Sequence, residues 1–182
     1  MKKLYISLIV LILLHASLFA GASDLGITLG TTTHWGESSY DSSKLTLAWG
    51  VTVGISDDLE LDLQANSTLV PQFFGDTTVA ILLQKSLLGQ RSTGTKVAGL
   101  GVNTLLGAGI LLSDYYYPGN FLLPTHILVS LTPLVVGNPI STKRERAFTV
   151  TLGYNFITTQ VSVFFDLLKY DFYLVGTYRD YL

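Results

Sequence analysis

The amino-acid sequence predicts an all-β protein, an eight-stranded antiparallel up-and-down transmembrane β-barrel. Three observations support this fold class: an N-terminus typical of exported proteins, a strongly apolar composition, and apolar and polar residues that alternate with period two. The chain has 182 residues, of which 48% are hydrophobic and 13% are charged. Soluble domains carry about 25% charged residues. A lipid solvent would account for the difference.

The N-terminus has the three parts of a secretory signal. Lys2 and Lys3 are the charged part, residues 4–14 are apolar, and Ala20-Gly21-Ala22 has the A-x-A form of a cleavage site. We therefore expect residues 1–22 to be a cleaved signal peptide and residues 23–182 to form one outer-membrane β-barrel domain. A retained membrane helix is the alternative. The absence of cysteine excludes a lipoprotein anchor and disulfides.

A helical membrane protein is the competing interpretation of the high hydropathy. The most apolar stretch, residues 97–112, is interrupted by glycines and by Asn103, and it is shorter than the roughly 20 apolar residues that a spanning helix needs. The next stretch, residues 121–136, contains two prolines. Both stretches favour strands over helices.

Alternation identifies the first three strands at residues 25–35, 45–55 and 59–66. Their lengths approach the 9–11 residues of a tilted spanning strand. Alternation alone does not distinguish a barrel with a polar interior from a soluble sandwich with an apolar core. The third strand has the clearest contrast, because leucine and alanine alternate with Glu60, Asp62, Gln64 and Asn66.

Strands four to six are expected at residues 78–87, 98–112 and 121–136. Glycines on the inward side of the fifth strand suit a narrow, strongly curved barrel. In the sixth, Pro124 lies one position off the apolar parity and indicates a strand edge or a bulge.

The seventh strand is expected to begin near Ala147. Its alternation changes parity around residues 158–161, which allows either a turn or a bulged continuation to Phe165. We prefer the continuation, with residues 166–171 as the last loop and residues 172–182 as strand eight.

With both termini in the periplasm, the outer loops would be residues 36–43, 71–77, 113–120 and 166–171. Acidic residues such as Asp166 would then lie outside, and basic residues such as Arg146 on the inner turns. We expect this acidic face to bind phosphate-rich lipid weakly; ordinary solvated loop charges are the alternative. Aromatic residues would form an outer rim, with ordinary loop and core positions as the alternative. The rim residues are Trp35, Phe73, Phe74, Tyr115, Tyr116 and Tyr117.

The signal, the alternation, the loop spacing and the ending Phe172-Tyr173-Leu174-Val175-Gly176-Thr177-Tyr178-Arg179-Asp180-Tyr181-Leu182 together resemble the small eight-stranded outer-membrane barrels of the OmpX, OmpA transmembrane-domain and OmpW kind. The resemblance covers essentially all of the mature chain. Members usually end in Phe, whereas this chain ends in Leu182. The resemblance implies membrane lipids, periplasmic chaperones and the barrel-assembly machinery as partners.

Polar residues on the inward parity are candidates for a network inside the barrel. Paired charges in a narrow barrel would plug it, because unpaired buried charge is costly; a narrow path for small solutes is the alternative. The candidate network consists of Glu60, Asp62, Gln64, Lys85, Asn103, His126 and Arg179.

The sequence contains no motif that indicates catalysis or cofactor binding. It contains no nucleotide loop, metal-ligand spacing or nucleophile elbow, so no catalytic residue, metal or cofactor is expected. The net charge of −2 argues against nucleic acid. We expect a structural, surface-interaction or limited small-solute transport role, with an unidentified host or surface ligand left open. The alternative is a lipid A-modifying enzyme that would use His34 or His126 with serine.

Overall fold

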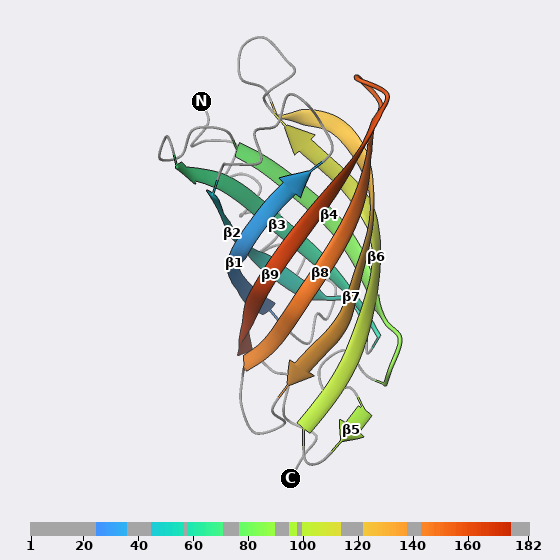
Figure 1. The fold of residues 1–182 in the computed structure, drawn as a ribbon. Coiled ribbons are helices and arrows are strands. Elements are labelled where there is room, and N and C mark those ends of the chain that lie inside the picture. Colours follow the sequence, from blue (N-terminus) through green and yellow to red (C-terminus); the bar gives the residue numbers. More distant parts are fainter. Residues whose placement is uncertain are drawn as a thin grey trace.

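The computed structural model describes residues 25–35, 45–56, 58–70, 77–89, 95–97, 100–113, 122–137 and 143–175, and the statements below refer to these. They contain nine strands and belong to one antiparallel sheet (Figure 1). The strands are β1 (Leu25–Trp35), β2 (Leu45–Gly54), β3 (Leu59–Val70), β4 (Thr77–Ser86), β5 (Thr95–Val97), β6 (Leu100–Ser113), β7 (Leu123–Gly137), β8 (Lys143–Asn155) and β9 (Gln160–Val175).

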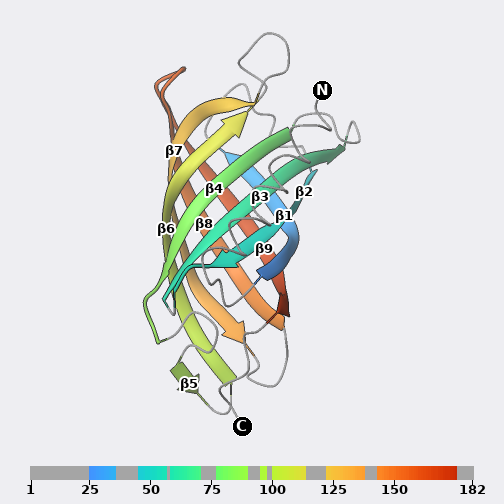
Figure 2. The same ribbon diagram turned by 180° about the vertical axis from the view of Figure 1, so that it is seen from behind.

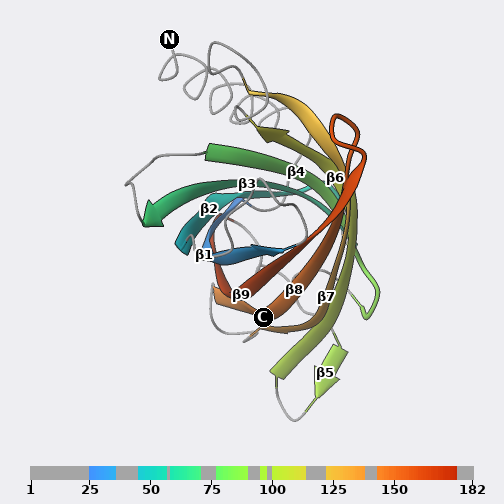
Figure 3. The same cartoon turned by 45° about the horizontal axis from the view of Figure 1, so that its top comes forward.

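The strand pairings run round a closed ring. Long strands that follow one another in the sequence pair with each other, β4 pairs with β6, and β1 pairs with β9. The ring is therefore β1-β2-β3-β4-β6-β7-β8-β9, and the three-residue β5 pairs with the end of β6. Figures 1 and 2 show the tilted strands from opposite sides, and Figure 3 shows them curving around a common interior. The predicted all-β, eight-stranded up-and-down fold is confirmed.

The prediction for the last two strands is wrong. Strand β8 begins at Lys143, earlier than expected, and ends at Asn155 in a turn over residues 156–159. Strand β9 then runs from Gln160 to Val175, so residues 166–171 lie inside a strand and are not a loop. The alternative that the parity change also allowed, a turn near residue 158, is the observed one.

The turn after β8 forms for local reasons. The Asn155 side-chain Oδ1 accepts hydrogen bonds from the backbone N–H groups of Ile157 (2.8 Å) and Thr158 (3.1 Å). Thr159 has a φ of 58°, in the left-handed region that reverses the chain direction. A bulged continuation would have left the Asn155 side chain without these two donors.

The barrel is polar inside and apolar outside. Buried side chains include Glu60, Asp62 and Arg146, each 0% exposed, whereas Ile127 and Val129 on the outer surface are 58% and 52% exposed. An apolar group also lies inside, formed by Ala80, Leu82, Leu111 and Leu128 with Phe164 packed against it. The residues predicted to face inward on β3 and β6 include several that are buried, among them Glu60, Asp62, Gln64 and Asn103.

Strand β7 contains two irregularities, each beside a proline. Its register to β6 shifts between Leu111 and Leu112, where Leu112 pairs with Pro124, which confirms the strand irregularity predicted there. A second shift lies at Pro133, whose carbonyl accepts a hydrogen bond from Thr104 Oγ1 (2.9 Å). Proline lacks the N–H that a regular ladder would use, so it suits both positions.

Gly109 allows the close approach of β4 and β6. A Cβ at this position would lie 1.9 Å from the backbone oxygen of Ile81 and 2.9 Å from Leu82 Cα. Since backbone atoms cannot rotate away, a side chain here would separate the two strands that close the ring.

Candidate functional site

The polar interior centres on Arg146 of β8. Its Nη1 donates hydrogen bonds to Asp62 Oδ2 and to Gln84 Oε1, both at 2.8 Å, and its Nη2 donates to Thr52 Oγ1 at 3.3 Å. Nη2 also lies 3.5 Å from Glu60 Oε1. We call these five side chains the Arg146 cluster. A planar guanidinium with several donors suits such multiple contacts.

The Arg146 cluster connects opposite walls of the barrel. Strand β8, which carries Arg146, is four strands from β3 in either direction round the ring, and β3 carries Glu60 and Asp62. Thr52 on β2 donates a further hydrogen bond to Asp62 Oδ1 at 3.3 Å. The two charged side chains of the Arg146–Asp62 pair are both 0% exposed. The cluster therefore links the two walls through charged side chains that cross the interior.

A second ion pair extends this polar layer. Lys169 of β9 pairs with Asp166 on its own strand and donates to Gln64 Oε1 on β3. Gln64 in turn donates from Nε2 to Asn66 Oδ1 at 2.8 Å. Lys169 is 1% exposed, and its backbone pairs directly with Arg146 in the β8–β9 register. The two basic side chains thus enter the interior side by side.

Three neighbouring strands change parity where these bases point inward. In a regular strand, two buried residues are separated by an even number of positions. Here the buried residues on either side of the change are three positions apart in each strand: Thr132 and Val135 in β7, Thr149 and Arg146 in β8, and Asp166 and Lys169 in β9. Register shifts near Pro133 in β7, and between the Tyr170 and Leu167 pairs of β9, accompany the change. Bulges reverse the side-chain alternation.

Sequence reasoning missed Arg146, Gln84 and Lys169 as interior residues and placed Arg146 and Asp166 on connections between strands. The sequence analysis expects this strand to begin only near Ala147, so it places Arg146 on the preceding turn, and strict alternation from Phe148 would point Arg146 outward. The signal that could have identified these positions is the broken alternation in three successive strands. Gln84 was recoverable more simply, because it shares the inward parity of Ala80 and Leu82.

Lys85 corrects another prediction, since it does not lie inside the barrel. It shares the outward parity of Ile81 and Leu83, and its side chain is 62% exposed. Its Nζ lies 3.5 Å from Asp58 Oδ2 at the β2–β3 turn. The pKa of Asp58 is lowered chiefly by the hydrogen bond from the Ser56 hydroxyl (2.8 Å), and the charge of Lys85 lowers it further.

Asn103 and His126 lie at opposite ends of the interior. Asn103 exchanges hydrogen bonds with Ser86 and accepts one from the Leu88 N–H at 3.2 Å. His126 Nδ1 lies 2.8 Å from Thr125 Oγ1, and its ring meets Phe164 edge-on at 5.9 Å. The buried Ser130 hydroxyl has no hydrogen-bond partner, so the structure does not join it to His126 as a catalytic pair.

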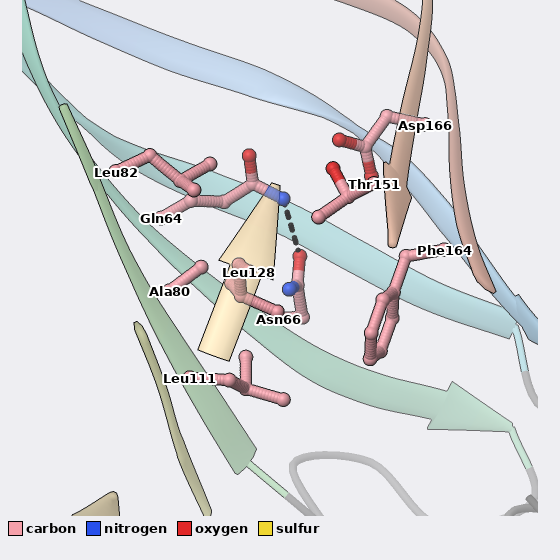
Figure 4. A pocket seen from close by; sticks show the side chains of 9 residues that line it. All are labelled: Gln64, Asn66, Ala80, Leu82, Leu111, Leu128, Thr151, Phe164 and Asp166. Atoms are coloured by element: carbon pink, nitrogen blue, oxygen red, sulfur yellow. Dashed lines mark hydrogen bonds between the residues drawn. The ribbon is translucent and has the colours of Figure 1, made fainter. Parts of the chain in front are cut away.

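A small pocket lies among the inward side chains of the described residues. Gln64, Asn66, Thr151 and Asp166 surround it with Phe164 and the apolar group of β4, β6 and β7 (Figure 4). The cavity measures about 20 Å³. A single water needs about 10–15 Å³. This pocket therefore suits ordered water between polar side chains and is too small for an organic solute.

Several predicted residues fall outside this description. Arg179 and the rim residues Phe73, Phe74 and Tyr115–Tyr117 lie outside the described residues, and Trp35 is described only as part of β1. Across the described ranges, no three His, Asp or Glu side chains are grouped as metal ligands. These ranges also contain no helix of the length and hydropathy needed to cross a membrane.

No protein-family model matches the chain, and no curated protein matches it in sequence. Among solved structures it is similar to a protein from work titled "De novo design of transmembrane beta-barrels", with 11% identity and a TM-score of 0.43. The similarity covers 82% of this chain and 96% of the designed one. A likeness this distant carries no functional argument, and membership of the OmpX, OmpA or OmpW group stays a prediction.

Proposed function

We propose that this protein is an integral outer-membrane β-barrel with a sealed interior and a non-catalytic, structural or surface-interaction role. The supporting observation is the inverted polarity of the barrel. In water, a closed sheet would bury its leucines and expose its charges, whereas here Glu60, Asp62 and Arg146 are buried and Ile127 and Val129 are exposed. Such an arrangement is stable where the surrounding solvent is hydrocarbon.

A closed barrel is also the form of sheet that hydrocarbon tolerates. Each long strand pairs with two neighbours, so the described backbone ladders leave no long open edge toward lipid. The exposed apolar side chains extend over several neighbouring strands, including Leu83 on β4, Leu106 on β6 and Leu152 on β8. This continuous surface would match the acyl chains of a bilayer.

The Arg146 cluster and the Lys169–Asp166 pair support a sealed interior. Both groups cross the lumen, and the cavity beside Gln64 is about 20 Å³. An eight-stranded barrel has an interior that side chains can fill. We therefore favour a sealed barrel over solute transport, and we expect no porin-scale conductance steps from the wild-type protein in planar bilayers; such steps would contradict the sealed interior.

Heat-modifiable migration tests the membrane proposal. Outer-membrane fractions of cells producing the chain are run on SDS gels with and without boiling, because closed barrels resist SDS until they are heated. We expect the protein in that fraction with different mobilities in the two lanes. Recovery in the soluble periplasmic fraction with equal mobilities would contradict the proposal and favour a soluble β-sandwich.

A further inference from the structure

The turn between β8 and β9 exposes apolar side chains where a surface turn normally exposes polar ones. Phe156 and Ile157 form its first half and are 45% and 42% exposed, although loop tips in water favour small polar residues. The segment from Tyr154 to Val161 contains no charged residue. The β2–β3 turn at the other end differs, since it contains Asp58 paired with Lys85.

The turn is held in one conformation. Besides the two hydrogen bonds to Asn155 Oδ1, the Phe156 N–H donates to the Thr125 carbonyl of β7 at 3.1 Å. Asn155 is 0% exposed, so its amide is fixed within the barrel wall. The apolar side chains of the turn are therefore presented by a rigid support.

The apolar surface of the turn continues the outer face of the barrel. Tyr154 (46% exposed) pairs with Ile127 on β7 and with Val161 on β9, and both partners are exposed. Further down β8, Leu152 and Val150 face the same way. No polar ring separates the turn from this outer face along β8.

The height of the apolar band places the turn at the membrane surface. Glu145, next to the inward Arg146, marks the lower end of the outward face of β8. From Phe148 to Phe156 the strand rises about 26 Å at ~3.3 Å per residue, or about 20 Å along the barrel axis at a tilt of about 40°. A band about 25 Å tall that starts just above Glu145 therefore reaches Phe156 and Ile157.

We propose that the β8–β9 turn is a lipid-binding anchor: Phe156 and Ile157 insert among the upper acyl chains, while Thr158, Thr159 and the Tyr154 hydroxyl face the lipid headgroups. This rests on the proposed membrane location and adds to it the position of one membrane surface. Aromatic and amphipathic side chains favour this interfacial zone. The barrel then does not project from the bilayer at β8–β9.

Site-specific tryptophans test the anchor in the full mature barrel folded into phosphatidylcholine vesicles. Trp35 and Trp49 are first replaced with phenylalanine to give a silent background. Ile157→Trp is the test variant and Phe156→Trp repeats the test at the same turn. The controls are Val129→Trp, at mid-height on the outer face, and Ser56→Trp, at the charged turn. All four positions are exposed, which permits the larger ring.

The quenchers are iodide in the buffer and bromine atoms attached to the lipid chain, either near the headgroup or near its end. Ile157→Trp and Phe156→Trp are expected to lose most emission with the shallow bromine and little with iodide. Val129→Trp should respond most to the deep bromine, and Ser56→Trp to iodide.

Strong iodide quenching of both turn variants, with Val129→Trp still quenched by brominated lipid, would overturn the anchor and leave the membrane barrel intact. Turn variants shielded from every quencher would also overturn it, because a protein partner or a second copy would then cover the turn. If brominated lipid fails to quench Val129→Trp as well, the membrane location itself is contradicted.

Discussion

Replacing Arg146 with methionine removes the charge that compensates Glu60 and Asp62 while keeping a long side chain in the lumen. In the wild-type barrel the guanidinium makes hydrogen bonds of 2.8 Å to Asp62 and Gln84, and all of these side chains are at most 1% exposed. Breaking a buried ion pair on one side costs about 3–5 kcal/mol. A second estimate comes from the hydrogen bonds themselves, since each bond to a charged group contributes about 1.5–3 kcal/mol.

The free energy of unfolding can be measured by urea titration of the refolded barrel in detergent or lipid, with the fluorescence of Trp35 and Trp49 and the gel mobility as probes. We expect Arg146→Met to lower it by about 3–5 kcal/mol. Lys85→Met is the matched control, because its ion pair with Asp58 is exposed and its removal should leave the urea midpoint nearly unchanged.

A compensating variant separates charge from packing. Adding Glu60→Gln and Asp62→Asn to Arg146→Met removes the two uncompensated charges, so most of the lost stability should return. If Arg146→Met lowers the free energy of unfolding by less than about 1 kcal/mol, or if the two added amide substitutions restore none of the loss, the Arg146 cluster is refuted as a source of stability.

Three further changes test separate parts of the structure. Gly109→Ala should destabilise the barrel by about 1–3 kcal/mol and more than Gly107→Ala, because the new methyl meets backbone at the first site and a movable side chain at the second; equal urea midpoints would contradict this. Deleting Pro133 should keep the heat-dependent gel shift, because Thr132 and Val135 then lie two residues apart and share the inward face of a regular strand, whereas deleting Val129 should abolish the shift, because it reverses the two faces on one side of the deletion; loss of the shift in the Pro133 deletion alone would contradict Pro133 as the extra residue of the bulge. Ser56→Ala should raise the pKa of Asp58 in an NMR titration. The small stabilisation from that hydrogen bond should be present at neutral pH and lost as the pH falls through the lowered pKa; an unchanged pKa would exclude the hydroxyl as its cause.

The fold could be predicted where each strand alternates without interruption. In β3 the two faces differ so clearly that Glu60, Asp62 and Gln64 could be placed inside from sequence alone. The same holds for the glycine-lined inner face of β6. Period-two alternation is a local property, and it suffices when the strand has no bulge.

The errors coincide with the three strands that change parity. Arg146 lies beyond a bulge that reverses which neighbours share a face, and a bulge depends on the register of the partner strand. Asp166 was expected in a loop for another reason: the parity change at residues 158–161 was interpreted as a bulged continuation, whereas it is a turn. The contact between Arg146 and Asp62 joins opposite walls of the ring, and no local pattern reports it. The error at Lys85 has a different source: it was predicted as a lumen partner for the acidic residues of β3, although it shares the outward parity of Leu83.

The most direct test of an inverted barrel in lipid is a scan along β7. The chain contains no cysteine, so single cysteines at residues 127–132 can each carry a nitroxide label in the protein folded into vesicles. Oxygen concentrates in lipid, so the account predicts that the collision rate of the label with oxygen is highest at residues 127, 129 and 131. It also predicts that a water-soluble nickel complex does not collide with the label at any of the six residues. Labels at odd-numbered positions that collide with the nickel complex as freely as with oxygen would contradict it, because the exposed apolar face would then be in water.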